Sequence, residues 1–209
     1  MAFEGDQGKP PGKAEEQNCA ERSPLTEEQI RAHTLGEPQQ VSGKIEISEY
    51  STEWPAMFKR EEAHITAALG SRALRIEHTG STSVPGLAAK PVIDLLLAVA
   101  DSADEGAYVP ALERAGYVLR IREPEWHEHR MFNRPGAAIN LHVFSSGCAE
   151  IERVLLFRDW LRNNPADRDV YARTKRSLAT KEWKYVQNYA DAKSAVVEQI
   201  LERASRSRQ

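Results

Sequence analysis

The hydrophobic and polar positions along this chain follow two different patterns. Up to about residue 144, short apolar runs of strand length alternate with turn residues, and one longer run over residues 54–69 has helical spacing. From Glu150 onwards, apolar residues recur every three or four positions, which is typical of amphipathic helices. The pattern predicts an α+β protein with a helical C-terminal segment.

The individual runs predict the positions of the elements. Strands are expected over residues 45–47, 74–78, 92–97 and 117–121, with two more on either side of residues 134–137. Helices are expected over residues 26–35, 54–69, 108–115, 151–162, 166–178 and 181–204. Thr26 and Gln29 have the spacing of a capping box, and Gly116 is placed to end the helix before it.

Composition divides the chain into three parts. Residues 1–24 are polar and rich in Gly, Pro, Glu and Lys, which predicts a disordered N-terminal arm. After it we expect a short N-terminal extension over residues 25–43 and a folded domain over residues 44–205, whose start is where the family resemblance described below begins. A chain of 209 residues, 41% hydrophobic and 28% charged, can bury one sizeable core.

A turn of small residues is the first candidate binding element. Glycine tolerates a close approach of the backbone, and short hydroxyl side chains leave the backbone N–H groups open to an anion. A helix that begins near Ser81 would add its free N–H groups, and Ser81 would then also serve as its N-cap. These features predict a phosphate-binding turn made of Gly80, Ser81, Thr82 and Ser83.

Asp94 is the first candidate catalytic residue. It lies inside the apolar run over residues 92–97, where a lone carboxylate is costly unless it is paired, hydrogen-bonded or bound to a metal. Metal binding is the preferred role, and a structural pair with Arg130 or a cap on the turn is the alternative. Lys90 would supply a positive charge near the turn, or else it is a solvated loop residue.

A second group of candidate residues surrounds a predicted hairpin. If residues 135–136 form a two-residue Pro-Gly loop, His129 lies opposite His142. His127 would share the face of His129, because strand side chains alternate. Imidazoles beside a carboxylate suit Zn, Mn, Fe or Ni better than Mg. A transition-metal site of Asp94, His129 and His142 is therefore one prediction.

The other polar residues of this hairpin have competing interpretations. Arg130 is interpreted as a catalytic phosphate clamp, with a structural salt bridge as its alternative. His142 would otherwise be a hydrogen-bonded structural histidine in an apolar strand. Glu123, Glu125 and Glu128 are expected at the rim of the site, where Glu125 or Glu128 could serve as a general base.

The longest motif carries a family resemblance. The run EHTGSTSVPGLAAKPVIDLLLAV, with IEISEYSTEWPAMFKREE before it and NLHVF, LLFRDWLRNNPADRDVYARTK and YADAKSAVVEQI after it, resembles the GrpB family over roughly residues 44–204. That family is assigned to the nucleotidyltransferase superfamily, which has the DNA polymerase β-like fold. The resemblance implies a mixed β-sheet flanked by helices, in which the Gly-Ser turn holds nucleotide phosphates and the acidic strand holds a divalent metal, Mg or Mn.

The acidic strand departs from the pattern of that superfamily. Nucleotidyltransferases usually carry two acids two positions apart, so that both carboxylates share the metals. Here the residue two positions after Asp94 is Leu96, and the next acids, Asp101 and Asp104, fall beyond the expected strand. A site with one metal, an unusual metal site and a protein without nucleotidyl transfer all stay open.

Basic residues of the C-terminal helices offer a further anion site. Lys175 lies in the YARTK segment that carries part of the resemblance, and it is the preferred nucleotide-binding residue of this group. Arg158, Arg162 and Lys193 could line the same pocket where the helices cover the sheet, and a solvated helix face is the alternative for each of them.

Three functions are compatible with these residues. The preferred one is metal-dependent transfer of a nucleotidyl group from a nucleoside triphosphate to a small molecule or a protein, with Asp94, Lys90 and Arg130 as catalytic residues. The second is a metal-dependent hydrolase, ligase or lyase that uses an Asp/His site on the same fold. The third is a non-catalytic nucleotide-binding or CoA-related accessory module, since some GrpB-like domains are joined to dephospho-CoA kinase.

The net charge and the apolar content of the chain limit the kinds of binding partner and the cellular location that we expect. A net charge of -3 disfavours a nucleic-acid partner. No apolar run has the length of a membrane span, and the first residues lack the pattern of a signal peptide. The two cysteines, Cys19 and Cys148, predict no disulfide framework. We therefore expect a cytoplasmic protein that does not associate with membranes.

Overall fold

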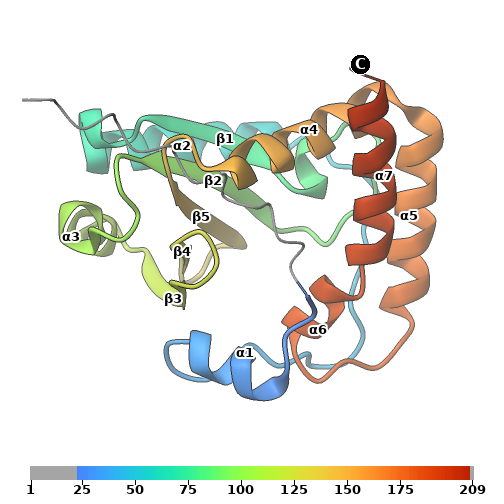
Figure 1. Cartoon of the computed structure of the whole chain (residues 1–209), viewed down its shortest axis with the longest axis horizontal. Coiled ribbons are helices and arrows are strands. Elements are labelled where there is room, and N and C mark those ends of the chain that lie inside the picture. Colours follow the sequence, from blue (N-terminus) through green and yellow to red (C-terminus); the bar gives the residue numbers. More distant parts are fainter. Residues whose placement is uncertain (1–22, 208–209) are drawn as a thin grey trace, which may run out of the picture.

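A computed structural model of the protein describes residues 23–207 (Figure 1). Most of the predicted N-terminal arm, including Cys19, lies outside these described residues. The helices are α1 (Glu27–His33), α2 (Trp54–Leu69), α3 (Glu105–Arg114), α4 (Ala149–Asn163), α5 (Pro165–Ala179), α6 (Val186–Asp191) and α7 (Ser194–Arg206), with 3-10 turns η1 (Gly70–Arg72) and η2 (Ser81–Ser83). The strands are β1 (Arg75–Thr79), β2 (Ile93–Val99), β3 (Val118–Glu123), β4 (His129–Asn133) and β5 (Ile139–Ser145).

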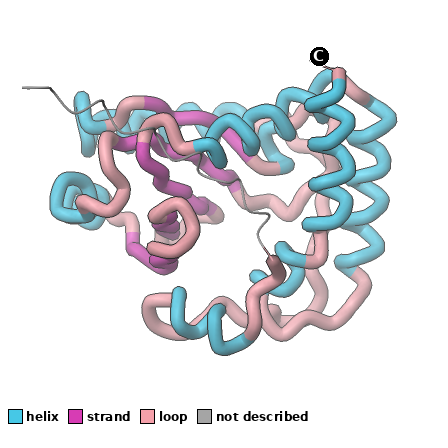
Figure 2. The backbone as a smooth tube through the Cα atoms, viewed as in Figure 1, coloured by secondary structure: helices cyan, strands magenta, loops and turns pink. Residues whose placement is uncertain are grey.

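One mixed β-sheet organises the described residues. Its strand order is β1-β2-β5-β4-β3, in which β2 and β5 pair in parallel and all other neighbours are antiparallel. Helices enclose the strands from several sides (Figure 2). The expected mixed sheet with flanking helices and a helical C-terminal segment is confirmed.

The two faces of the sheet differ because side chains alternate along each strand. On β2, Ile93, Leu95 and Leu97 are fully buried in the largest hydrophobic cluster, which includes residues of α2 and α3. Asp94 and Leu96 therefore point to the opposite face. The helix α4 packs on only part of that opposite face, and the rest of it is open to a cavity.

Two of the predicted helix ends are confirmed by their geometry. The α1 helix begins with the expected capping box, in which the N–H of Gln29 donates to Oγ1 of Thr26 over 3.2 Å and the N–H of Thr26 donates to Oε1 of Gln29 over 2.9 Å. Gly116 follows α3 with a φ of 87°, a left-handed conformation that favours glycine.

The strand predicted over residues 45–47 does not form. The only pairing near it is an isolated bridge between Ser48 and Ala89, among the residues that the structure describes. The next hydrogen-bonded pair of an antiparallel ladder would need an N–H from Pro91, which has none. The ladder therefore ends after one bridge.

The single helix predicted over residues 181–204 is also wrong, because the chain breaks there into α6 and α7. Residues before α6 pair with the N-terminal extension, and the N–H of Val41 donates to the carbonyl of Lys184 over 3.1 Å. Between α6 and α7, the turn at Ala192 and Lys193 changes the direction of the chain, and Lys193 lines the cavity.

The N-terminal extension, residues 25–43, is fastened at two points. Thr34 forms a bridge with Ile121 on the edge strand β3, and Gln40 forms a bridge with Tyr185 just before α6. The segment between these bridges runs across the open face of the sheet, with α1 below β3 and β4 in Figure 1. Over residues 23–207, no helix combines the length and the apolar character that a membrane crossing requires.

Candidate functional site

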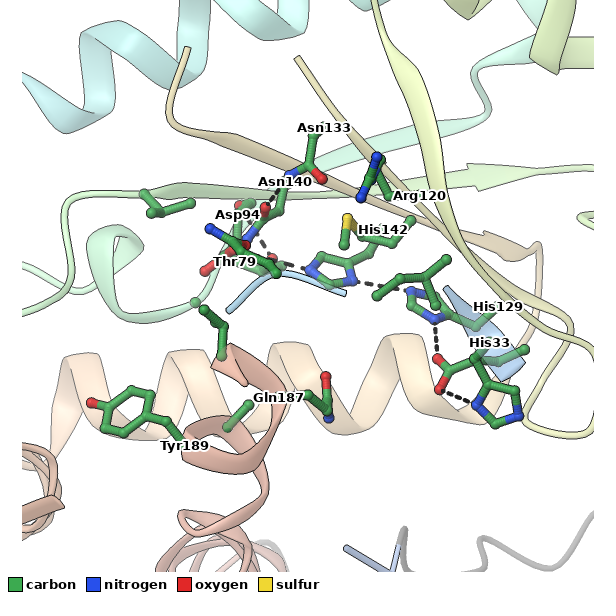
Figure 3. A pocket seen from close by; sticks show the side chains of 18 of the residues that line it. His33, Thr79, Asp94, Arg120, His129, Asn133, Asn140, His142, Gln187 and Tyr189 are labelled. Atoms are coloured by element: carbon green, nitrogen blue, oxygen red, sulfur yellow. Dashed lines mark hydrogen bonds and ion pairs between the residues drawn. The ribbon is translucent and has the colours of Figure 1, made fainter. Parts of the chain in front are cut away.

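A cavity of about 430 Å³ lies against the open face of the sheet (Figure 3). It is bounded by the sheet, the Gly-Ser turn, the N-terminal extension and residues of α5, α6 and the start of α7. This volume is in the range of small-molecule binding sites. Of the predicted site residues, those that line it are Gly80, Ser81, Thr82, Lys90, Asp94, His129, His142 and Lys175.

Gly80 brings the Gly-Ser turn directly against Asp94. Its φ of 65° and ψ of −175° are readily adopted only by glycine. A Cβ at this position would overlap Oδ2 of Asp94 and would lie 3.0 Å from Cγ of the same side chain. The absence of a side chain therefore allows the backbone of the turn to contact the carboxylate.

The hydroxyl groups of the turn have different surroundings. The Ser83 hydroxyl donates to the carbonyl of Gly80 over 2.6 Å, and the Thr82 hydroxyl donates to the carbonyl of Val92 over 3.1 Å. Ser81 is half-buried and lines the cavity, whereas Ser83 is buried outside its wall. The helix expected near Ser81 is a single 3-10 turn without a side-chain N-cap, so the turn offers local N–H groups rather than a helix dipole.

Two asparagines orient Asp94. Asp94 is the second residue of β2, and its side chain is 29% exposed. The side-chain amide of Asn140 donates to Oδ1 of Asp94 over 2.8 Å, and the amide of Asn133 donates to Oδ1 of Asn140 over 2.8 Å. Figure 3 shows this row of side chains crossing three strands. The carboxylate is thus fixed in position and still accessible from the cavity.

Lys175 is a buried cation in the wall of the cavity. Its side chain is 2% exposed, and its Nζ donates to the carbonyl of Ala88 over 2.5 Å. Burial, assisted by the positive charges of Lys193 and Arg176, lowers the pKa of Lys175 to about 7. An anion in the cavity would favour its charged form.

Lys90 and Lys193 add two further amines to the same wall. Burial lowers the pKa of Lys193, the charge of Asp94 opposes this effect, and the charge of Lys90 adds to it. Positive charge is therefore concentrated beside the Asp94 carboxylate. A polyanionic ligand would relieve the mutual repulsion of these amines.

The imidazole rings of His129 and His142 lie in contact, although the predicted register of the hairpin is wrong. Residues 134–138 make a longer connection than the expected two-residue loop, and Met131, not His129, pairs with His142. The shift is two residues, so His129 stays on the same face. Its Nε2 lies 3.0 Å from Nδ1 of His142. His127 does not share this face, because it lies in the turn before β4 with a φ of 56°.

Arg130 does not line the cavity, and the structure contradicts its assignment as a phosphate clamp. It neighbours His129 on β4 and therefore points to the other face, where it is 4% exposed. Its guanidinium donates to Glu105 of α3 over 2.6 Å and to Glu128 over 3.1 Å. The pair between Arg130 and Asp94 is likewise absent, and the structural salt bridge is the role that the geometry supports.

One of the three acidic residues of this region differs from expectation. Glu123 is not a rim residue, since it is 1% exposed and its Oε2 lies 2.7 Å from Nδ1 of His129. Glu125 is 77% exposed at its side chain, and Glu128 is paired with Arg130.

Several residues of the cavity were not found from the sequence. Asn140 shares the face of His142 because it lies two positions before it, so strict alternation along the NLHVF segment would have found it. Ile30 and His33 come from the N-terminal extension, and no local pattern indicates that this segment folds back over the sheet.

The donor groups near Asp94 fit one hard cation. Mg²⁺ in proteins is commonly held by one or two carboxylates together with substrate phosphates. Asp94 supplies one carboxylate, and Leu96 occupies the place of a second one. Nowhere in residues 23–207 are three His, Cys, Asp or Glu side chains grouped to hold a metal ion. One Mg²⁺ or Mn²⁺ shared with phosphates therefore fits, whereas a metal pair and a site of Asp94, His129 and His142 do not fit this arrangement.

The fold and the site define an α+β protein with a lysine-rich cavity on one face of a five-stranded mixed sheet. The sequence profile described as GrpB protein matches residues 44–203. The chain thus belongs to the GrpB family, as the resemblance of its motifs implied.

Individual relatives agree with this assignment. The chain is 57% identical over 183 residues to a UPF0157 protein of Halalkalibacterium halodurans, with 88% of this chain and 94% of that protein covered. It is 31% identical over 172 residues to a dephospho-CoA kinase of Mycolicibacterium paratuberculosis, with 70% of this chain and 42% of that protein covered. The crystal structure of the conserved protein GrpB from Enterococcus faecalis has a TM-score of 0.69 at 32% identity, with 78% of this chain and 98% of that chain covered.

Proposed function

We propose that the protein binds a nucleoside triphosphate with one Mg²⁺ or Mn²⁺ ion and transfers the nucleotidyl group to a small-molecule or protein acceptor. The observation that carries this proposal is the position of the Gly80 turn, the Asp94 carboxylate and three lysines around one cavity. Backbone N–H groups and amines bind phosphate oxygens, and a carboxylate beside them can hold the cation that accompanies the phosphates.

Each part of the cavity has a role in this proposal. The turn at Gly80 and Ser81 would bind phosphate oxygens, and Lys90, Lys175 and Lys193 would neutralise the β- and γ-phosphates. Asp94, held by Asn140, would keep the cation beside the α-phosphate. When bound, the cation would act as a Lewis acid that reduces the negative charge of the phosphates.

The proposed transfer is a displacement at the α-phosphorus. A hydroxyl or amine of the acceptor forms a bond to phosphorus, while the bond from phosphorus to the oxygen that bridges to the β-phosphate breaks. The electron pair of that bond leaves with pyrophosphate, and the proton of the acceptor passes to water. Negative charge grows on the leaving pyrophosphate, where amines stabilise it most.

A second candidate is a module that binds a CoA precursor without chemistry. The match to part of a dephospho-CoA kinase supports it, because 42% of that protein corresponds to this chain. The phosphate groups of a CoA precursor would use the same amines. Binding alone therefore does not distinguish the two candidates, but transfer of a labelled nucleotidyl group does.

Calorimetry of the full chain tests the proposal. ATP, GTP, CTP, UTP and dephospho-CoA are titrated with and without Mg²⁺ or Mn²⁺, and at least one triphosphate is expected to bind tenfold more tightly with the cation. Asp94→Asn should remove this cation dependence, whereas Asp101→Asn, in the exposed loop after β2, should retain it. If no triphosphate binds with either cation, the proposal is wrong, and binding of dephospho-CoA alone would favour the second candidate.

A further inference from the structure

We infer that Arg162 of α4, together with Arg158, is a positioning residue that holds the phosphate-binding turn from outside the cavity. This inference rests on the proposed function, because it takes the turn at Gly80 and Ser81 as the place of the phosphate oxygens. It assigns α4 a part in phosphate binding, although neither arginine would contact the ligand.

The two arginines lie outside the wall of the cavity, although the sequence allowed both of them in an anion pocket. They are one helical turn apart on α4, so their side chains project from the same side of the helix. This side faces the end of β1 and the Gly-Ser turn, where the Arg158 side chain is 10% exposed and the Arg162 side chain is 36% exposed. A ligand in the cavity would therefore have no direct contact with either guanidinium.

Each arginine donates instead to a backbone carbonyl at one end of the turn. Nη1 of Arg158 donates to the carbonyl of His78 over 3.0 Å, two residues before Gly80. Arg162 donates to the carbonyl of Ser83 through Nε over 3.1 Å and through Nη2 over 2.9 Å. Both carbonyls thus point toward α4, and both ends of the turn are fixed to the same helix.

Asp159 links the two guanidinium groups. Its Oδ1 accepts from Nε of Arg158 over 2.8 Å and from Nη1 of Arg162 over 3.2 Å. Arg158 also donates to Oε2 of Glu77 in β1 over 2.7 Å. A guanidinium that is held on several sides keeps its planar N–H groups in fixed directions. The acidic partners therefore orient the arginines toward the two carbonyls.

Ser83 transmits this restraint to Gly80. The N–H of Ser83 donates to the carbonyl of Gly80 over 3.3 Å, and the Ser83 hydroxyl donates to the same carbonyl over 2.6 Å. Gly80 in turn lies against the Asp94 carboxylate. A continuous series of contacts therefore connects the Arg162 guanidinium with the proposed ligand of the cation.

The direction of the Ser83 carbonyl matters for a phosphate in the cavity. A carbonyl oxygen carries partial negative charge, whereas peptide N–H groups attract phosphate. Without Arg162, the carbonyl would lose both of its guanidinium donors, and this end of the turn would be free to rotate toward the cavity. The affinity for phosphate should then fall, because the N–H groups of the turn would no longer be held in one direction.

The positive charges of the arginines also reach the turn. Burial, together with the charges of Arg162 and Arg158, lowers the pKa of His78 to about 4. Such a field would attract phosphate even without a precise geometry. The test must therefore separate the charge of Arg162 from the bonds that it makes.

Calorimetry of the full chain measures the effect on phosphate directly. MgATP and inorganic tripolyphosphate with Mg²⁺ are the two probes, because they share three linked phosphates and only one carries a nucleoside. Arg162→Met is expected to weaken both at least fivefold and by factors that agree within twofold. A purely structural role would lower the stability but leave the Kd of the folded protein unchanged, and circular dichroism verifies the fold.

Arg72→Met is the matched control. Arg72 also donates to backbone carbonyls, those of Leu69 over 3.0 Å and Ala107 over 2.9 Å, but it does not line the cavity or contact the turn. This variant removes the same charge from the chain and is expected to bind both probes within twofold of wild type. An equal loss in Arg72→Met would overturn the inference.

Arg162→Lys separates the charge from the bonds. Lysine keeps the positive charge but lacks the planar fork that places two N–H groups on one carbonyl. This variant is expected to bind both probes at least threefold more weakly than wild type. Wild-type affinity in Arg162→Lys would assign the effect to charge alone and overturn the positioning role.

Hydrogen exchange tests the restraint without any ligand. Exchange of the backbone amides in residues 80–84, followed by mass spectrometry, is expected to be at least fivefold faster in Arg162→Met than in wild type. Arg72→Met should exchange at the wild-type rate in this segment. Equal exchange in wild type and Arg162→Met would show that the arginine does not hold the turn.

The outcomes separate this inference from the proposed function. If both probes bind and Arg162→Met leaves both Kd values within twofold of wild type, the inference alone is wrong. If tripolyphosphate binds and is weakened in Arg162→Met while no nucleoside triphosphate binds, the inference stands and the proposed function is wrong. If neither probe binds to the wild-type protein, both are wrong.

Discussion

Gly80 lies against Asp94 so closely that a side chain at position 80 would overlap the carboxylate oxygen Oδ2. The two residues come from separate parts of the motif, one in the turn after β1 and one in β2, and antiparallel pairing of Thr79 with Asp94 brings them together. The glycine therefore sets the distance between the N–H groups of the turn and the carboxylate.

This contact predicts that Gly80→Ala lowers cation-dependent binding of the triphosphate at least tenfold, because the carboxylate must move to make room for a methyl group. Gly86→Ala is the matched control. Gly86 has a similar φ of 76°, but nothing lies within 4 Å of a Cβ at that position. Both variants should lose about 1 kcal/mol of stability from backbone strain. Equal binding losses in calorimetry would show that strain, not the contact with Asp94, is responsible.

The pKa of Lys175 predicts a pH dependence of anion binding. Below pH 7 its amine is charged in the folded protein and attracts phosphate, and as pH rises through 7 the charge and the attraction are lost. The Kd of MgATP should therefore rise at least threefold between pH 6 and pH 8.5. In Lys175→Met this rise should be much smaller, whereas Lys59→Met, an exposed lysine outside the cavity, should keep it. A pH profile unchanged in Lys175→Met would contradict this role.

His78 predicts a loss of stability in mild acid. Its ring stacks on Phe58 with 4.8 Å between centroids, and its Nε2 lies 3.1 Å from the hydroxyl of Thr82. Burial, with the charges of Arg162 and Arg158, lowers the pKa of His78 to about 4. The unfolded chain binds this proton near pH 6.5, so stability is complete above that pH and falls by about 3 kcal/mol toward pH 4.

Urea unfolding at several pH values measures this effect. The variant His78→Gln should lose most of the pH dependence between pH 6.5 and pH 4, and His64→Gln serves as the control because His64 binds the carbonyl of Ala115 far from the turn. The interpretation of His78 is wrong if wild type and His78→Gln show the same dependence.

Arg130→Met should destabilise the fold without affecting the site. The buried guanidinium joins Glu105 and Glu128 on the face opposite the cavity, and its loss should cost about 2 kcal/mol. Arg122→Met removes another bond to the same Glu105, but Arg122 is 42% exposed, so its loss should cost less than about 1 kcal/mol. Both variants should bind MgATP within twofold of wild type. A tenfold loss in Arg130→Met would restore Arg130 as a functional residue.

The sequence predicted those parts of the site that depend on local structure. The Gly-Ser turn and Asp94 lie on consecutive elements, so the turn and the strand after it could be placed from the hydrophobic pattern alone. Alternation along the hairpin also put His129 and His142 on one face. That result survived an error in register because the error was two residues, which restores the same face.

Other parts depended on contacts between distant segments. Arg130 was interpreted as a phosphate clamp, but it faces the side of the sheet opposite to His129, and Glu105 of α3 is its partner there. The position of Lys193 in the cavity depends on the break between α6 and α7, which follows pairing of the chain with residues 39–41. Helical periodicity alone does not reveal such a break.

The two bridges of the N-terminal extension have a further consequence for how the molecules behave in concentrated solution. β3 is an edge strand, and the N–H of Leu35 donates to the carbonyl of Arg120 on it over 2.8 Å. Edge strands with open N–H and C=O groups pair readily with other chains. A chain that begins at residue 44 would expose this part of the edge together with the apolar wall of the cavity, so we expect it to aggregate more readily than the full chain.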